Sequence, residues 1–208
     1  MDYTNNREQI LEMLRQLISE EKYTHSLGVE KTAIELAKNY HVDADKAGLA
    51  GLLHDITKSM DNVALAKEYG IINYLSKKTL HAYTGAIYIA RSQITKDSDI
   101  LNAIKYHTTG REAMSMLEKI IYLADLIEPG RECQALEKIR PICYQDIDAA
   151  MLLALKMSIK LIIKRSTPID LNTVFAYNYY SKLNTVPKNS PEENEWKFPK
   201  KQSKSQQS

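Results

Sequence analysis

The sequence has few of the residues that mark secreted or fibrous proteins. Its 208 residues include only 2 cysteines, 7 glycines and 6 prolines. The cysteines, Cys133 and Cys143, cannot form a disulfide framework, and they are too far apart in sequence to resemble a paired thiolate metal site. The low glycine and proline content excludes a collagen-like chain. The length and the 44% hydrophobic content instead indicate one globular domain with free thiols.

The chain also lacks a long apolar run. Its most apolar stretch, Ala149 to Ile163, contains Lys156 and Lys160 and is shorter than the ~18 residues that a membrane span needs. The first residues, Met1 to Arg7, are polar and do not have the basic-then-apolar order of a secretory signal. We therefore expect a cytoplasmic protein with no membrane partner.

An excess of one charge sign is missing as well. The chain has 28 basic and 26 acidic residues, and five of the lysines and three of the glutamates fall in residues 185–208. The body therefore carries 23 residues of each sign. A neutral body argues against a nucleic-acid partner.

Residues 185–208 differ in composition from the rest of the chain. Pro187, Pro191 and Pro199 alternate there with Lys, Ser, Glu, Asn and Gln. Such a segment cannot bury enough apolar surface to offset its ordering entropy. We therefore expect a folded domain over residues 1–184 and a disordered polar tail over 185–208. The alternative is that Trp196 and Phe198 dock on the body or on a partner.

Apolar residues recur with a period near 3.6 almost throughout the body, and strict alternation is not found. This pattern predicts an all-α fold. The expected helices are 6–19, 23–39, a helix after an Asp43 N-cap to about 56, a short helix after Asp61, and then 80–93, 98–106, 113–127, 132–139, 147–164 and 171–183.

Histidines and aspartates stand out on these helices. Four of the five histidines share a helix face or end with small or apolar residues, and we expect them to point inward: His25, His54, His81 and His107. His41 lies between two helices and should be exposed and unliganded. Asp55 follows His54 directly, and Asp125 lies within the apolar run 120–127.

A buried carboxylate without a partner is costly, so these aspartates need one. A divalent cation bound by imidazole nitrogens and carboxylate oxygens would satisfy both aspartates and the four histidines together. The alternative is a helical scaffold or partner-binding module whose histidines are only hydrogen-bonded.

The order His25, His54-Asp55, Asp125 resembles the H…HD…D signature of the HD-domain metal-dependent phosphohydrolases. Longer strings resemble the YqeK-type branch of that family, the symmetrical bis(5'-nucleosyl)-tetraphosphatases. The matching strings are 23–26, 51–58, 81–86, 106–110, 118–125 and 128–131. The resemblance covers about residues 8–183 and implies an HD-domain helical bundle.

The resemblance also implies the ligands and the cofactor. The metal ligands would be His25, His54, Asp55 and Asp125, and the metal would be iron. The residue types alone disfavour magnesium and calcium but leave manganese, cobalt and zinc open. His81 and His107 either complete a second metal site or contact the phosphates of the substrate, so one or two ions are expected.

Further residues would contact a nucleotide. Lys58 follows Asp55 by three positions and Arg131 follows Asp125 by six, so both can reach phosphate oxygens. Thr108 offers a hydroxyl and a backbone amide beside His107. By resemblance, His25 and Asp125 also border the substrate, Asp55 and Lys58 are catalytic, and the region of Pro168, Ile169 and Asp170 helps to hold the nucleoside.

The implied reaction is hydrolysis of diadenosine tetraphosphate to two ADP by metal-activated water. Three alternatives stay open: another HD-type hydrolase such as a 5'-nucleotidase or a cyclic-dinucleotide phosphodiesterase, a metal-retaining nucleotide sensor without turnover, and the helical scaffold. The partner is then a small-molecule nucleotide, and a homodimer is left open.

Overall fold

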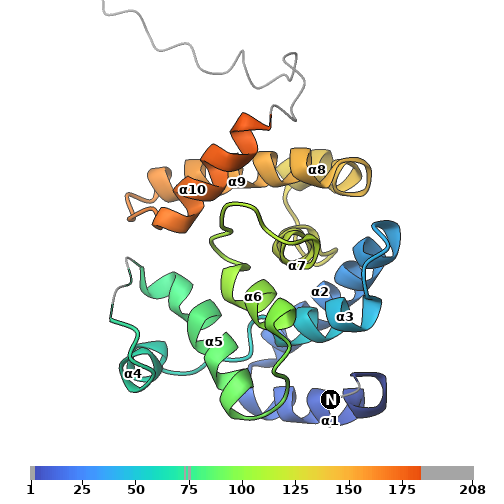
Figure 1. Cartoon of the computed structure of the whole chain (residues 1–208), viewed down its shortest axis with the longest axis vertical. Coiled ribbons are helices and arrows are strands. Elements are labelled where there is room, and N and C mark those ends of the chain that lie inside the picture. The colour runs from blue at the N-terminus through green and yellow to red at the C-terminus, as the bar shows by residue number, and fades with distance from the viewer. Residues whose placement is uncertain (1–2, 73, 75, 184–208) are drawn as a thin grey trace, which may run out of the picture.

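The structure is a computed structural model that describes residues 3–72, 74 and 76–183 (Figure 1). Over those ranges it contains ten α-helices, one short 3-10 helix and no strand, so the predicted all-α fold is confirmed. The elements are α1 Tyr3–Leu17, α2 Glu20–Asn39, α3 Ala44–Leu53, α4 Asn62–Glu68, η1 Lys77–Thr79, α5 Leu80–Arg91, α6 Ser98–Tyr106, α7 Met116–Ile127, α8 Gln134–Gln145, α9 Ile147–Lys164 and α10 Leu171–Lys182.

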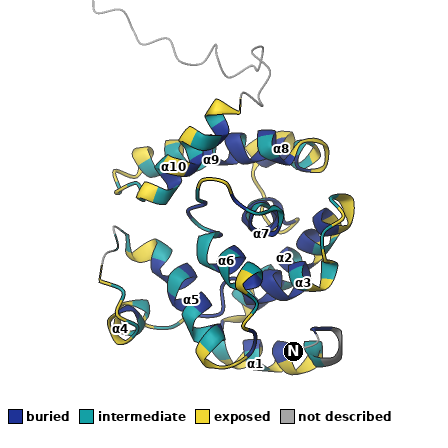
Figure 2. Cartoon of the chain, viewed as in Figure 1, coloured by how far each residue is buried: buried dark blue, intermediate teal, exposed yellow. Residues whose placement is uncertain are grey.

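Helix α7 is central to the fold. It packs against α2, α3 and α6 and also against α8 and α9. In Figure 1, α8, α9 and α10 lie across one end of the molecule, and α7 lies between them and the remaining helices. The inward faces are buried along their length (Figure 2), and the core includes the fully buried Leu36, Leu52, Ile104 and Ile120.

Helices α2 and α3 approach each other closely at Gly51. A Cβ atom on Gly51 would lie 3.0 Å from the Cα atom and 3.1 Å from the backbone nitrogen of Glu30. A side chain there would force the two helices apart, because these neighbours are backbone atoms that cannot turn aside. The glycine thus brings the end of α3 against α2.

Side-chain caps set several helix starts. The Asp43 carboxylate accepts from the backbone nitrogens of Asp45 and Lys46, and Asp61 caps α4 in the same way. Both starts were predicted from the sequence, since an aspartate at an N-cap satisfies otherwise free amide groups.

Several predicted helix boundaries differ from the structure: α1 begins at Tyr3 instead of residue 6 and α2 at Glu20 instead of residue 23, and three further differences have identifiable causes. Helix α7 begins at Met116 instead of residue 113, because Ser115 and Glu118 form a capping box there. Helix α8 runs from Gln134 to Gln145 and does not stop at residue 139 before Pro141. The proline is exposed, and the apolar face of α8 continues beyond it to the buried Cys143.

The third boundary matters for function. The helix expected to reach Ile56 ends at Leu53, and the following residues form tight turns. Ile56 donates to the Leu53 carbonyl at 3.1 Å and Lys58 to the Asp55 carbonyl at 2.8 Å. These bonds to the third residue back replace the fourth-residue bonds of a continuing α-helix, so α3 ends directly before His54 and Asp55.

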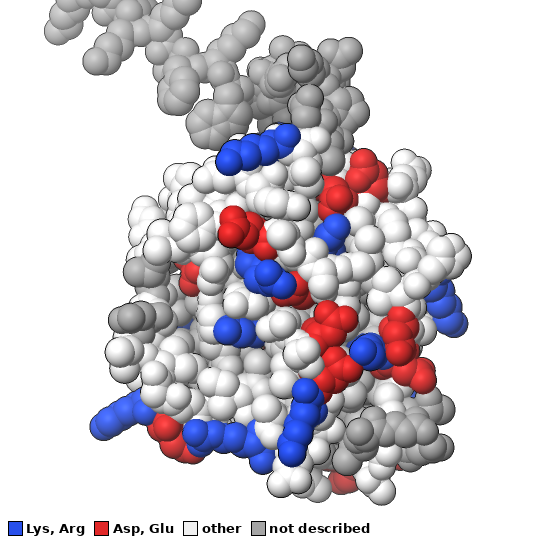
Figure 3. All heavy atoms as spheres, viewed as in Figure 1, with Lys and Arg blue, Asp and Glu red and all other residues white. Residues whose placement is uncertain are grey.

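Among the described helices, none is both long and apolar enough to cross a membrane. Acidic and basic side chains alternate over the face of the molecule shown in Figure 3. Residues 184–208, including Trp196 and Phe198, lie outside the described residues, so the expectations for the tail stay predictions.

Candidate metal centre

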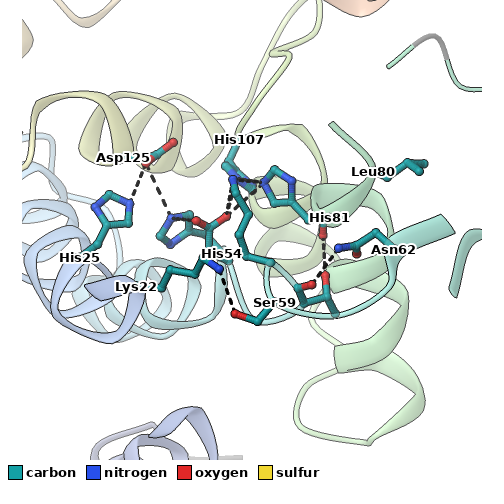
Figure 4. A network of polar contacts seen from close by, with 12 residues as sticks. Lys22, His25, His54, Ser59, Asn62, Leu80, His81, His107 and Asp125 are labelled. Carbon is teal, nitrogen blue, oxygen red and sulfur yellow. Dashed lines mark hydrogen bonds and ion pairs between the residues drawn. The ribbon is translucent and has the colours of Figure 1, made fainter. Parts of the chain in front are cut away.

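Five helical segments bring four histidines and two aspartates together, and Figure 4 shows the four histidines and Asp125. Helix α2 carries His25, the end of α3 carries His54 and Asp55, α5 carries His81, the end of α6 carries His107, and α7 carries Asp125. We call these six residues the His-Asp cluster. Its histidine rings succeed one another at centroid separations of 5.2 Å for His25 and His54, 5.0 Å for His54 and His107, and 5.2 Å for His81 and His107.

His54 is fully buried, and one of its ring nitrogens has no partner. Its Nδ1 donates to the Gly51 carbonyl oxygen at 2.7 Å, so Nε2 carries the lone pair. Nε2 is buried without a hydrogen-bond partner, 3.6 Å from Asp55 Oδ2 and 3.7 Å from Asp125 Oδ1. Burial lowers the pKa of His54 to about 4, which keeps the ring neutral near pH 7. A neutral nitrogen facing two carboxylates is a ready ligand for a cation.

Asp55 faces His81, His107 and Lys58 and is 5% exposed. Its Oδ1 lies 3.1 Å from His81 Nε2, 3.5 Å from His107 Nε2 and 3.3 Å from Lys58 Nζ. Burial acts to raise the pKa of Asp55, but His54, His107 and His81 outweigh it and hold the pKa well below the ordinary value. Asp55 is therefore ionised. It belongs both to the group with His25 and His54 and to the group with His81 and His107.

His81 and His107 direct lone pairs at each other. His107 Nδ1 donates to the Ile104 carbonyl at 2.7 Å, and Lys58 Nζ donates to His81 Nε2 at 2.9 Å. The two Nε2 atoms, 3.2 Å apart, both present acceptors beside the Asp55 carboxylate. A cation among these three groups would relieve their repulsion.

His25 and Asp125 are the most exposed members of the cluster. His25 Nε2 lies 2.9 Å from Asp125 Oδ1, and Arg131 Nη2 donates to the same oxygen at 2.5 Å. Burial acts to lower the pKa of His25, but the bonds to Asp125 and Glu128 raise it overall. Burial acts to raise the pKa of Asp125, but His25, His54 and Arg131 bring it well below its ordinary value. The side chain of Asp125 is 21% exposed, so this carboxylate is partly buried, and it has the polar partners that the sequence led us to expect.

The cluster contains three overlapping groups whose potential ligand atoms lie within 4.8 Å of one another. These groups are His25, His54 and Asp55; His54, His107 and Asp125; and Asp55, His81 and His107. The four residues predicted as ligands are thus brought together, and His81 and His107 join them. Mixed nitrogen and oxygen donors of this kind fit a divalent transition metal.

An open pocket of about 600 Å³ borders the cluster. We call it the entrance pocket; it is lined by Glu20, Glu21, Lys22, Thr24, His25, Asp55, Lys58, Glu128, Gly130 and Arg131. The predicted Lys58 and Arg131 are both there, with side chains 37% and 44% exposed, so each can reach a bound anion.

Two residues of the entrance pocket were missed in the sequence. Lys22 precedes His25 by three positions, and its Nζ donates to Ser59 Oγ at 3.0 Å (Figure 4). Glu128 follows Asp125 by three positions, and its Oε1 lies 3.1 Å from His25 Nδ1. Spacings of three place residues on one helix face, so this signal could have pointed to both.

A neighbouring helix supports the loop that carries Arg131. Arg140 on α8 donates to the carbonyl oxygens of Ile127 at 3.0 Å, Glu128 at 3.3 Å and Arg131 at 2.8 Å. Arg131 itself donates from Nε to the Asp125 carbonyl at 2.6 Å. The loop is thus tied to α7 and α8 at both of its ends.

The remaining predicted residues, Thr108 and residues 168–170, lie outside the lining of the entrance pocket. Thr108 follows His107, and its buried hydroxyl has no hydrogen-bond partner. Asp170 caps α10, preceded by Pro168 and Ile169 in the link from α9. Asn172, on the first turn of α10, donates to the Tyr83 hydroxyl at 3.0 Å and so brings this link near α5. His41 is exposed, as predicted.

Histidines and aspartates gathered at one point in an all-helical fold form a centre suited to a divalent metal. The HD domain family matches residues 23–130, a range that includes all six residues of the His-Asp cluster. The chain therefore belongs to the HD domain family.

Relatives within that family share a more specific name. The symmetrical bis(5'-nucleosyl)-tetraphosphatase of Halalkalibacterium halodurans is 38% identical over 180 residues, covering 83% of this chain and 96% of the relative. The protein of that name from Bacillus subtilis strain 168 is 35% identical over 181 residues, covering 84% and 97%. The resemblance to this branch is confirmed.

A solved structure agrees in fold. It is the crystal structure of a predicted HD superfamily hydrolase involved in NAD metabolism from Clostridium acetobutylicum. The two folds superpose with a TM-score of 0.79 at 36% identity, over 85% of this chain and 97% of the other.

Proposed function

We propose that this protein hydrolyses dinucleoside tetraphosphates symmetrically, splitting diadenosine tetraphosphate into two ADP. The observation that carries the proposal is the buried, partnerless Nε2 of His54, which faces the carboxylates of Asp55 and Asp125. An unpaired acceptor between two anions is costly unless a cation sits among them. The names of the two bacterial relatives supply the substrate class.

The residues that hold the ion in this proposal are His25, His54, Asp55 and Asp125. Iron is the metal that the family resemblance implies, and manganese or cobalt fit the same donors. Asp55 also faces His81 and His107, so a second ion can bind on that side; otherwise these two histidines contact the phosphates. Metal analysis of anaerobically purified wild type and His81→Ala separates these two cases. If His81 is a ligand of a second ion, the variant should contain one metal equivalent less than wild type; if His81 contacts the phosphates, the metal content should be unchanged.

Three cationic side chains in the entrance pocket suit a polyphosphate. Lys58 lies beside Asp55, Arg131 beside Asp125, and Lys22 on the same wall as His25. Lys58 and Arg131 neutralise the charge that develops on the transferred and leaving phosphates. Thr108 and the link of residues 168–170 extend these contacts toward the nucleoside.

A divalent ion bound in the cluster supplies a Lewis acid for a phosphoryl oxygen and makes water a stronger nucleophile at neutral pH. Water adds its oxygen to one inner phosphorus, and the bond from that phosphorus to the central bridging oxygen breaks. Both products are ADP, and the proton of the attacking water is released. ADP is a good leaving group, so the proposal needs no dedicated general acid.

The test is a product assay on the purified protein. With diadenosine tetraphosphate, we expect chromatography to show two ADP per substrate, and a chelator to abolish the reaction. ATP plus AMP would contradict symmetrical cleavage, and undiminished turnover in chelator would contradict the metal. We assign the activity to residues 1–184, so a chain ending at residue 184 should retain it.

A further inference from the structure

A buried carboxylate lies just outside the His-Asp cluster. Glu128 follows the last residue of α7 and is 5% exposed. One oxygen, Oε1, lies 3.1 Å from His25 Nδ1, and the other, Oε2, accepts from the backbone nitrogen of Gly130 at 2.6 Å. We propose that Glu128 is a positioning residue that holds the His25 ring with Nε2 facing the metal. This inference rests on the metal role proposed for His25.

The other anchored histidines show why His25 needs such a residue. His54 and His107 each donate from Nδ1 to the backbone carbonyl three residues earlier, at 2.7 Å in both cases. Those carbonyls are backbone groups of α3 and α6, so the helices themselves fix the positions of the acceptors. His25 instead relies on a side chain that is flexible in isolation. Its orientation therefore depends on what holds Glu128 in place.

Two features of the backbone hold the Glu128 carboxylate. The Gly130 amide fixes Oε2 from one side. On the other side, Gly28 of α2 leaves room, since a Cβ atom there would lie only 2.6 Å from Oε2. The missing side chain at position 28, one turn of helix after His25, is therefore matched to the position of the carboxylate. An alanine at 28 would push Glu128 away and leave every polar group of the site present.

The carboxylate controls which nitrogen of His25 is available. With Nδ1–H donated to Oε1, the lone pair lies on Nε2, on the side of Asp125 and His54. A carboxylate behind a ligating imidazole fixes its tautomer and makes the ring a stronger ligand. Without Glu128, the ring can rotate or take its other tautomer, and Nε2 no longer faces the ion.

The experiment measures Mn²⁺ affinity of the full-length protein by calorimetry. We expect Glu128→Ala to weaken Mn²⁺ binding by about 10- to 100-fold, the usual cost of losing such a partner. Gly28→Ala should weaken it in the same direction, although alanine is the better helix former. Glu128→Gln should lose less than Glu128→Ala, because its amide oxygen can still accept from Nδ1. The control is Glu132→Ala, which removes an exposed carboxylate nearby and should bind Mn²⁺ like wild type.

A second readout follows the ring itself. Long-range ¹H–¹⁵N spectra of the Zn²⁺-loaded protein should show the His25 proton on Nδ1 in wild type, and a weakened or lost preference in Gly28→Ala. If Glu128→Ala fails to fold, Gly28→Ala alone decides. Folded variants that keep wild-type Mn²⁺ affinity and the wild-type tautomer would overturn the role of Glu128. A wild type that binds no Mn²⁺ would instead overturn the proposed function.

Discussion

Asp55→Asn removes one negative charge from the centre of the His-Asp cluster while keeping the shape of the side chain. Asp55 belongs to two of the three groups of potential ligand atoms, so the substitution weakens both groups. A catalytic metal stabilises a transition state by several kcal/mol, and losing ~4 kcal/mol corresponds to ~1000-fold in rate. The amide oxygen can still accept from Lys58, so the fold should lose no more than ~1–3 kcal/mol. We therefore expect a folded variant with at least ~1000-fold lower turnover.

The assay combines metal content by mass spectrometry with ADP release by chromatography. His41→Ala is the matched control, because it removes an exposed histidine away from the cluster and should keep wild-type metal content and turnover. Asp55→Asn protein that retained the wild-type metal content and turned over within tenfold of wild type would refute the reasoning.

Three further predictions concern the ion, the entrance pocket and the thiols. Mn²⁺ at ~100 times its dissociation constant should stabilise the protein by ~2.7 kcal/mol. This corresponds to a rise in melting temperature of ~5–10 °C, which a chelator should reverse. An unchanged melting temperature in calorimetry would count against the site. Lys22→Ala should raise KM for diadenosine tetraphosphate about fivefold, or ~1 kcal/mol, with kcat nearly unchanged. The control Lys67→Ala, which removes an exposed lysine, should change neither constant. An equal fall in kcat would place Lys22 in the chemical step. Burial raises the pKa of Cys143 to about 12, so at pH 8 its thiol stays protonated, and iodoacetamide should label only the exposed Cys133 until the protein is unfolded; two adducts on native protein in mass spectra would contradict this.

The helices and the principal residues of the site could be predicted because their signals are local. Asp43 and Asp61 mark helix starts through bonds to the next few amides, and those bonds need no knowledge of the rest of the fold. The adjacency of His54 and Asp55, with Asp125 in an apolar helix, raised the need for a shared cation before any geometry was known.

The turn at residues 54–59 could not be predicted from local signals. Periodicity continued the helix to Ile56, but Thr57 Oγ1 donates to the His81 carbonyl at 2.9 Å, a contact with a helix that begins later in the chain. Pro141 misled in the opposite way, since burial of Cys143 and its neighbours outweighs the single helix bond that the proline cannot make. In both places tertiary packing overrides the local preference.

Glu128 and Lys22 were missed for a related reason. Lys22 directly precedes a predicted helix and Glu128 directly follows one, but the roles we propose for them depend on where α2 runs past α7 and on which side the entrance pocket opens. The space that Gly28 leaves for the Glu128 carboxylate is a property of two chain segments together. A single sequence does not reveal such a match.

The three bonds from Arg140 connect α8 to the loop of the entrance pocket, although α8 carries no residue of the His-Asp cluster or of the pocket lining. This guanidinium spans the carbonyl groups of Ile127, Glu128 and Arg131, so a small shift of α8 would displace the whole segment that carries both Arg131 and Glu128. A substitution in this surface helix can thus alter the entrance pocket while every residue of the His-Asp cluster is retained.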